Sequence, residues 1–280
     1  MQTRFTAAAI QTCAQKDKRA NLDRAAQLAR DAHASVKPLL IAFPEVFFWR
    51  GLPAEEKAAA EALTGPTVTR MAELARELSC WLLMGSFLET AHGEERPYNT
   101  SVLLDPKGQV SATYRKIHLF DVHVDGVGAV RESATRAPGS QAVVAPLALP
   151  GGGVAKLGLS VCYDLRFPEL YRAHSAAGAQ VLMVPAAFTA RTGRDHWLAL
   201  LRARAIENLA WVIAPNQHGT GGEGIDTYGR SCVIDPWGTV VATAADGEGW
   251  TSAVIDLEQQ RAIRERFPAL DHRRPDVRAP

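Results

Sequence analysis

The sequence predicts an α/β protein built as a four-layer αββα sandwich, with a single domain over residues 1–280. Three observations support this prediction. Short apolar runs, many of them β-branched, alternate with segments of helical periodicity. Two Asp-Pro-x-Gly turns, one in each half of the chain, each join a pair of alternating strands. No low-complexity linker divides the 280 residues, and α/β chains of this length often form one domain.

The apolar runs are the strand candidates, and they recur along the whole chain. They are FTAAAIQ, PLLIAF, WLLMGSFL, SVLLD, VSATYR, VAKLGLSV, AQVLMVPA, WVIAPN, RSCVID and SAVID. Helical patterns lie between them, over residues 21–32, 66–78, 168–177, 195–209 and 259–267. In SVLLDPKGQVSATY and CVIDPWGTVVATA, Pro presets φ and Gly closes a type I turn, which predicts two hairpins. Two sheets packed face to face with helices outside accommodate this pattern.

The composition favours a small, nearly neutral partner. Lys and Arg total 31 against 30 for Asp and Glu, a net charge of +1, so we expect no general affinity for nucleic acid or an anionic membrane. No apolar run reaches the roughly 18 residues of a membrane span, and the N-terminal apolar segment is short for a secretory signal. The four cysteines form no CxxC pair and no zinc-type cluster. We therefore expect a cytoplasmic protein without disulfides, metal or cofactor.

The segment LGLSVCYDLRFPEL, residues 157–170, places a thiol where an apolar strand ends. Cys162 follows the strand, and Pro168 begins a helix after a short loop, which is where α/β proteins hold ligands. A catalytic thiol also needs a base and a group that stabilises an oxyanion. Free cysteines are more often inert core residues, and this is our interpretation of Cys13, Cys80 and Cys232.

Two charged residues in apolar surroundings are candidate partners for the thiol. Glu45, in LLIAFPEVFFW, has apolar neighbours whose desolvating effect suits a general base. Lys116, in VSATYRKIHLFD, shares a strand face with apolar side chains. Either residue is alternatively an ordinary polar residue at a strand end. From chemistry alone, a Cys-His enzyme that uses His196 or His218 also remains open.

Three motifs, taken in order, resemble the catalytic motifs of the nitrilase or carbon-nitrogen hydrolase superfamily. They are FPE around Glu45, YRKIHLFDV around Lys116 and SVCYDLRFPEL around Cys162. The resemblance runs from the first strand to HRRPD near the C-terminus, and it implies the αββα sandwich. It also implies a triad with Glu45 as base, Lys116 as cation and Cys162 as nucleophile. A second family glutamate, set before a Pro-Gly pair, corresponds to Glu132 in RESATRAPG.

Further segments resemble the Nit branch of small amidases within this superfamily. They are CYDLRFPEL, PAAFTARTGRDHWLALLRARAIEN, YGRSCVIDPWGTVVA and HRRPD. The resemblance implies hydrolysis of the terminal amide of a small carboxylate-bearing substrate, foremost deaminated glutathione, to acid and ammonia through a cysteine thioester. An ω-amidase acting on 2-oxoglutaramate, an N-carbamoyl amidase and a nitrilase are the alternatives. A non-catalytic binding protein is disfavoured because the triad is complete, and a redox thiol protein because no resolving cysteine adjoins Cys162.

Four residues near the triad are candidates for substrate binding. The Tyr163 backbone amide faces the oxyanion, Arg166 is a candidate clamp for a substrate carboxylate, and Phe188 and Tyr228 are candidate pocket walls. For Arg166 an ordinary ion pair is the alternative, and for the two aromatic residues it is a place in the core.

Two further expectations concern the surroundings of the site. In PNQHGTGGEGID, residues 215–226, glycines replace the more charged loop of the Nit branch, which leaves the choice of substrate open. The family resemblance also implies a homodimer or higher homo-oligomer, paired through the helix at residues 168–177.

Overall fold

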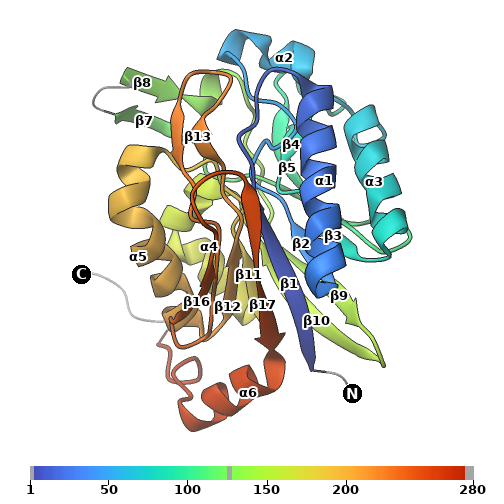
Figure 1. Ribbon diagram of the computed structural model, residues 1–280. Coiled ribbons are helices and arrows are strands. Elements are labelled where there is room, and N and C mark those ends of the chain that lie inside the picture. Colours follow the sequence, from blue (N-terminus) through green and yellow to red (C-terminus); the bar gives the residue numbers. More distant parts are fainter. Residues whose placement is uncertain (1–2, 125–127, 275–280) are drawn as a thin grey trace, which may run out of the picture.

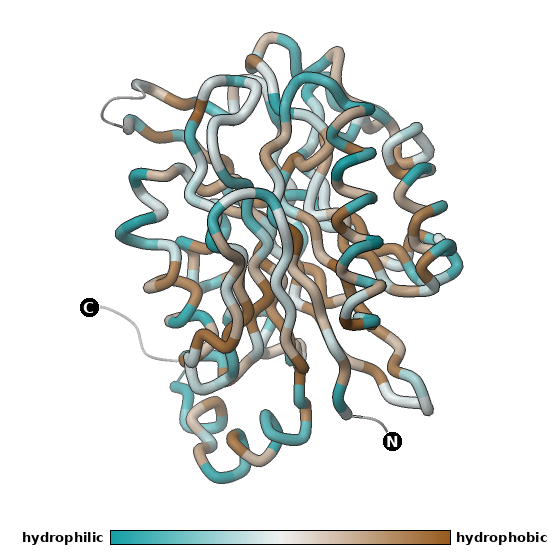
Figure 2. Tube along the Cα trace, viewed as in Figure 1, coloured by the Kyte–Doolittle hydropathy of each residue, from teal (hydrophilic) through white to brown (hydrophobic). Residues whose placement is uncertain are grey.

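The computed structural model describes residues 3–124 and 128–274. Two β-sheets pack face to face, and helices cover the outer face of each (Figure 1). This arrangement confirms the predicted four-layer αββα sandwich. Hydrophobic residues gather on the central strands, and hydrophilic residues mark the outer helices (Figure 2).

Within the described residues, the first sheet contains seven strands in the order β17-β1-β2-β3-β5-β4, with β6 paired to β5. Its strands are β1 (Arg4–Gln11), β2 (Leu40–Ala42), β3 (Trp81–Leu83), β4 (Phe87–Glu89), β5 (Tyr98–Leu104), β6 (Val110–Arg115) and β17 (Gly249–Asp256). The helices on its outer side are α1 (Lys18–Val36) and α3 (Pro66–Leu78), and a short 3-10 turn (Pro53–Glu55) leads into α2 (Glu56–Ala59).

The second sheet, again counted over the described residues, has six strands in the order β16-β15-β12-β11-β10-β9. They are β9 (Val143–Leu149), β10 (Gly153–Leu159), β11 (Val181–Met183), β12 (Trp211–Ala214), β15 (Cys232–Ile234) and β16 (Val240–Thr243). Helices α4 (Pro168–Ala176) and α5 (Ala190–Asn208) cover it, and α6 (Leu257–Arg266) follows β17. Two small hairpins are β7 (Asp121–Val124) with β8 (Gly128–Arg131), and β13 (His218–Thr220) with β14 (Asp226–Tyr228).

Alternation along the strands supplies two separate cores. Ala7 and Ala9 of β1 point into the core between the sheets, whereas Ala8 and Ile10 point into the core beneath α1 and α3. Because both faces of the strand are covered, its sequence is apolar throughout. The two Asp-Pro-x-Gly turns form as predicted and connect β5 to β6 and β15 to β16.

Several elements differ from the sequence prediction for identifiable reasons. WLLMGSFL, predicted as one strand, divides into β3 and β4 around Gly85, which has φ +59°. The helix predicted from residue 195 begins at Ala190. Gly193 lowers helical propensity in its first turn, yet it lets the helix contact Tyr228, where a Cβ would lie 2.4 Å from the Tyr228 Cβ. Strand β9 was not predicted; Pro146 is tolerated there because β9 is an edge strand.

His174 of α4 is a buried titratable group without a polar partner. It is fully buried, and neither ring nitrogen has a hydrogen-bond partner among the described residues. Its ring packs against Gly158, where a Cβ would lie 2.8 Å from the His174 Cγ. Burial lowers the pKa of His174 to about 4, so the folded protein holds this imidazole neutral.

We expect this histidine to make the fold sensitive to acid. Its pKa is about 4 in the folded chain against 6.5 for the ordinary group, so the unfolded chain binds the extra proton between these values. The buried histidine therefore costs no stability above pH ~6.5. Toward pH ~4 it lowers the free energy of unfolding, by about 2 kcal/mol between pH 7 and 4.5. Urea unfolding of the wild type and of His174→Leu at both pH values should show that the variant lacks this component. His92→Gln, at an exposed histidine, is the control; an equal pH dependence in His174→Leu would refute the assignment.

Candidate active site

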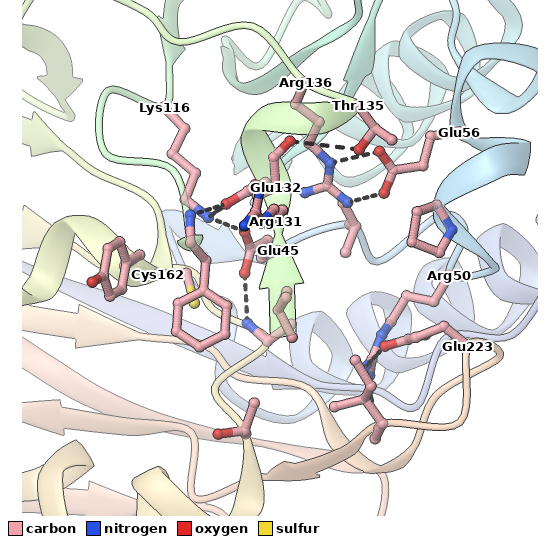
Figure 3. A pocket seen from close by; sticks show the side chains of 18 of the residues that line it. Glu45, Arg50, Glu56, Lys116, Arg131, Glu132, Thr135, Arg136, Cys162 and Glu223 are labelled. Atoms are coloured by element: carbon pink, nitrogen blue, oxygen red, sulfur yellow. Dashed lines mark hydrogen bonds and ion pairs between the residues drawn. The ribbon is translucent and has the colours of Figure 1, made fainter. Parts of the chain in front are cut away.

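The ends of β2, β6 and β10 open on a cavity of about 410 Å³ (Figure 3). Its walls include Glu45, Lys116, Glu132 and Cys162, so the structure brings all four predicted catalytic residues together. Small-molecule sites commonly have volumes of about 300–1,000 Å³. The cavity is also lined by Arg50, Glu56, Phe120, Arg131, Arg136, Tyr163, Ala187, Phe188, Glu223 and Ile225.

Lys116 lies between two glutamates. Its Nζ is 3.0 Å from Glu45 Oε1 and 2.8 Å from Glu132 Oε2, and the side chain is 2% exposed. Burial alone would lower the pKa of Lys116, but the charges of Glu132 and Glu45 outweigh burial and raise the pKa above its ordinary value. Lys116 is therefore a permanent cation at neutral pH.

The backbone on both sides fixes the position of Lys116. It directly follows β6, its N–H donates to Asn99 O at 2.9 Å, and its carbonyl accepts from Gly139 N at 2.8 Å. Gly139 comes so close that a Cβ would lie 2.1 Å from Arg115 O. Glycine is required here because no side chain fits between these two segments.

Glu132 belongs to a wider buried charge network. Arg136 Nη1 donates to Glu132 Oε1 at 2.8 Å, and Glu56 receives two hydrogen bonds from the same guanidinium at 3.1 and 2.6 Å. Burial would raise the pKa of Glu132, but the charges of Lys116 and Arg136, with hydrogen bonds from Lys116 and the Phe120 amide, lower the pKa to about 2. Glu132 is thus a fixed anion that holds Lys116 in place.

Glu45 is held at both carboxylate oxygens. Oε1 accepts from Lys116 and, at 2.8 Å, from Asn99 Nδ2, while Oε2 accepts from the Ala187 amide at 2.9 Å. Strand β2 ends at Ala42, and Val46, directly after the glutamate, has φ +44°. These contacts fix a buried carboxylate beside the thiol of Cys162, the geometry required of a general base.

Cys162 lies three residues beyond the end of β10, which stops at Leu159. The predicted strand VAKLGLSV runs to Val161, but the observed strand stops two residues earlier, and Cys162 opens a 3-10 turn over Cys162–Arg166. Its φ is +49°, an uncommon conformation for a residue with a Cβ. The Cys162 amide donates to Pro185 O at 2.9 Å, which stabilises this turn and directs the thiol into the cavity.

The electrostatic surroundings keep this thiol protonated at rest. Burial first, and then the charge of Glu45, raise the pKa of Cys162 well above its ordinary value, while the charge of Lys116 opposes them. A proton must therefore leave the sulfur when it becomes a nucleophile, and Glu45 is the group positioned to accept it.

Asp164 links the cysteine turn to the lysine segment, a role that the sequence did not indicate. It is fully buried, and Oδ2 accepts from Val161 N at 2.9 Å and from Tyr114 Oη at 2.7 Å. Oδ1 accepts from His118 N at 3.0 Å. The bond to Val161 caps the turn locally, whereas Tyr114 and His118 belong to a distant segment, which no local pattern reveals.

The predicted substrate-binding residues fall into two groups. Tyr163 and Phe188 line the cavity, whereas Arg166 and Tyr228 are not among its lining residues. The Arg166 guanidinium carbon lies 5.3 Å from the centre of the Phe188 ring and 5.9 Å from that of Tyr163, so it packs behind these aromatic walls. Arg166 also contacts His196 at 3.3 Å.

The sequence missed several residues of the site. Asn99, which is fully buried, donates to both Glu45 and Glu132. The two histidines considered as alternative partners of the thiol, His196 and His218, do not line the cavity.

Within residues 3–124 and 128–274, no group of three or more His, Cys, Asp or Glu side chains could hold a metal ion. In the same residues no helix is both long and apolar enough to cross a bilayer.

We expect no thiolate on Cys162 near neutral pH, because burial and Glu45 hold its pKa well above the ordinary value. Ultraviolet difference spectra between the wild type and Cys162→Ala should show no thiolate absorbance from about pH 6 to 9, the range that includes the ordinary thiol pKa. Cys80→Ala serves as the control, since burial raises the pKa of Cys80 to about 12. A thiolate band at pH 7 that disappears in Cys162→Ala would contradict the assignment.

Known proteins are similar to this chain in both sequence and fold. The family model for carbon-nitrogen hydrolase matches residues 6–265. The deaminated glutathione amidase of Homo sapiens is 44% identical over 274 residues, covering 96% of this chain and 82% of the relative. The protein of the same name from Synechocystis sp. is 40% identical over 270 residues, covering 96% and 98%.

A solved structure agrees with this similarity. The NitFhit protein of C. elegans superimposes with a TM-score of 0.90 at 36% identity, over 99% of this chain and 66% of that one. With a family match over most of its length and a glutamate, lysine and cysteine meeting in one buried cavity, the chain belongs to the carbon-nitrogen hydrolase family.

Proposed function

We propose that the protein is a thiol amidase that hydrolyses deaminated glutathione through a thioester on Cys162. The observation that carries the proposal is the meeting of the Cys162 thiol, Glu45 and Lys116 in one cavity. Relatives at 40–44% identity over 96% of the chain are deaminated glutathione amidases, which supports the choice of substrate.

In the first half of the reaction Glu45 accepts the thiol proton while the sulfur attacks the amide carbonyl. The negative charge that develops on the carbonyl oxygen is stabilised by Lys116 Nζ and by the backbone amide of Tyr163. Protonated Glu45 then donates its proton to the leaving nitrogen as the carbon-nitrogen bond breaks. The amine departs, and the acyl group remains as a thioester on Cys162.

In the second half a water molecule enters the place of the amine. Glu45, again a carboxylate, accepts a proton from this water, which attacks the thioester carbonyl under the same oxyanion stabilisation. The thiolate leaves and regains the proton from Glu45, which releases the acid. Glu132 keeps Lys116 fixed throughout. Its pKa is about 2, so the carboxylate stays ionised near neutral pH.

The leaving group separates the proposed substrate from its nearest rival. In deaminated glutathione the amide nitrogen belongs to cysteinylglycine, so that dipeptide is the amine released. The expectation from the sequence that this substrate yields ammonia is therefore corrected. In 2-oxoglutaramate the same acyl group carries a primary amide, so ammonia is released. Both substrates yield 2-oxoglutarate, which makes this acid the common product to measure.

Arg131 is the proposed anchor for a substrate carboxylate, in place of Arg166. Four glutamates line the cavity, and each is paired with Lys116, Arg136 or Arg50. Arg131, exposed at the end of β8, also lines the cavity, and no ion pair is found for it within the described residues. A guanidinium without an internal anion is well suited to bind a carboxylate.

Assembly into a homodimer is also part of the proposal. Leu170 and Tyr171, on the helix expected to form the interface, are buried within the chain. Pairing through α4 would therefore use its exposed Ala173 together with Ile206 of the adjacent α5, which is 48% exposed.

The proposed function is tested by 2-oxoglutarate release from deaminated glutathione. We expect turnover by the wild type, and a loss of at least about 10³-fold in kcat/KM for Cys162→Ala, Glu45→Gln and Lys116→Ala, because each removes a reacting or charge-stabilising group. Cys13→Ser should retain activity, since Cys13 does not line the cavity. Near-normal turnover by Glu45→Gln would refute the proposed triad. Release of 2-oxoglutarate from 2-oxoglutaramate alone would change the substrate but keep the mechanism.

A separate measurement tests the anchor. Arg131→Gln should raise KM for deaminated glutathione about tenfold, the loss expected for one charge-assisted hydrogen bond, with little change in kcat. A short neutral amide should be hydrolysed equally by the wild type and the variant. Arg19→Gln, which removes a charge from a side chain 93% exposed, is the control. An unchanged KM for the acidic substrate in Arg131→Gln would eliminate this residue as the anchor.

A further inference from the structure

The glycine-rich segment at residues 215–226 packs directly onto Arg50. A Cβ on Gly221 would lie 2.3 Å from Arg50 Cζ, and one on Gly222 would lie 2.1 Å from Arg50 O. Arg50 itself is 4% exposed. Glycines are needed here because the segment runs against a buried guanidinium, with no room for side chains.

This contact places Glu223 in the cavity wall. Arg50 Nη2 forms an ion pair with Glu223 Oε1, and the same guanidinium contacts Ile225 O at 3.3 Å and Thr227 Oγ1 at 3.4 Å. Figure 3 shows Arg50 and Glu223 together at the end of the cavity away from Cys162. The pair therefore lies where the part of the substrate remote from the reacting carbonyl would be held.

The second oxygen of this carboxylate is buried and unsatisfied. Glu223 Oε2 has no hydrogen-bond partner among the described residues. The other glutamates of the cavity, Glu45, Glu56 and Glu132, accept hydrogen bonds at both oxygens. Leaving a buried charged acceptor unpaired is costly. Because Glu223 lines the cavity, a ligand donor that reaches Glu223 Oε2 would relieve this cost.

We propose that Glu223 determines specificity by accepting a peptide N–H from the leaving-group side of the substrate. This inference rests on the proposed function. The 2-oxoglutaryl acyl group supplies no N–H beyond the scissile amide, which reacts at Cys162. A donor at the far end must come from the amine portion, and the cysteinylglycine peptide bond provides one. The Arg50 pair neutralises Glu223, so a carboxylate-bearing peptide is not repelled there.

The inference predicts that Glu223 distinguishes two substrates that share one acyl group. 2-Oxoglutaramate has no N–H beyond its reacting amide, so it cannot use Glu223. In Glu223→Gln the amide oxygen pairs with Arg50, and the amide nitrogen, a donor, replaces the unpaired oxygen. We expect kcat/KM for deaminated glutathione to fall about ten- to a hundredfold, as for loss of a hydrogen bond to a charged group. The value for 2-oxoglutaramate should change less than about twofold, which also reports that the variant is folded.

A matched control lies on the same segment. Asp226 pairs with Thr220 Oγ1 and does not line the cavity, so Asp226→Asn makes the same acid-to-amide change outside the site. It should leave both kcat/KM values unchanged.

A substrate that lacks the N–H of the cysteinylglycine peptide bond completes the test. Deaminated glutathione methylated on the nitrogen of the cysteinylglycine peptide bond should be hydrolysed by the wild type as poorly as the parent substrate is by Glu223→Gln. The variant should show no further loss with the methylated substrate, because the two changes remove one interaction. Additive losses, or equal losses on both substrates in Glu223→Gln, would overturn the inference and leave the proposed function standing. Release of 2-oxoglutarate from neither substrate by the wild type would instead remove the proposed function, and the inference with it.

Discussion

The buried contact of Lys116 with Glu45 and Glu132 is the interaction on which the rest of the site depends. Removing three charges from water costs several kcal/mol per ion unless each finds excellent partners. Here the compensation is extensive, since Asn99, the Ala187 and Phe120 amides and Arg136 satisfy the remaining oxygens. Asn99 lies on β5 of the first sheet, Ala187 follows β11 of the second, and Phe120 and Arg136 lie in loops. The burial of the lysine therefore depends on both halves of the sandwich.

Backbone strain is the second constraint, and it falls beside the reacting groups. Val46, directly after Glu45, and Cys162 both have positive φ although each carries a Cβ. Such conformations cost of order 1–3 kcal/mol each and persist only where surrounding contacts impose them. The Val46 amide donates to Ser86 Oγ at 3.0 Å, and the Cys162 turn is held by Pro185 and by Asp164. The two turns bring a carboxylate and a thiol from different sheets to the same point.

The cavity has a reacting end around Cys162 and Lys116, and a selecting end around Glu223, which Figure 3 shows away from Cys162. At the reacting end the charges are fully satisfied, which leaves the thiol proton as the group that moves. At the other end Glu223 has an unpaired oxygen, and Arg131, which also lines the cavity, has no ion pair among the described residues. In the proposed function these two residues select the substrate, and the triad carries out the reaction.

Patterns in the sequence predicted the layers and indicated Glu45, Lys116 and Cys162 as the residues of the proposed triad. Strand alternation, the paired Asp-Pro-x-Gly turns and three ordered motifs are local patterns, and local patterns survive in one dimension. Sequence also identified Glu132 beside its Pro-Gly pair, although its role stays a proposal. It did not reveal β9, the start of α5 or the two small hairpins, because edge position and packing against Tyr228 override propensity there.

The support of the site and the residues at its far end follow from contacts that exist only in the folded chain. Besides local bonds to Glu132 and Val161, Arg136 and Asp164 bond to partners many residues away, as Asn99 does. The spacing of residues in the chain does not predict these distant contacts. The glycines at 221 and 222 indicated only a flexible loop in the sequence, yet in the fold they allow close contact with Arg50. A residue's partners depend on distance in space, and burial then decides whether an unpaired oxygen such as Glu223 Oε2 matters.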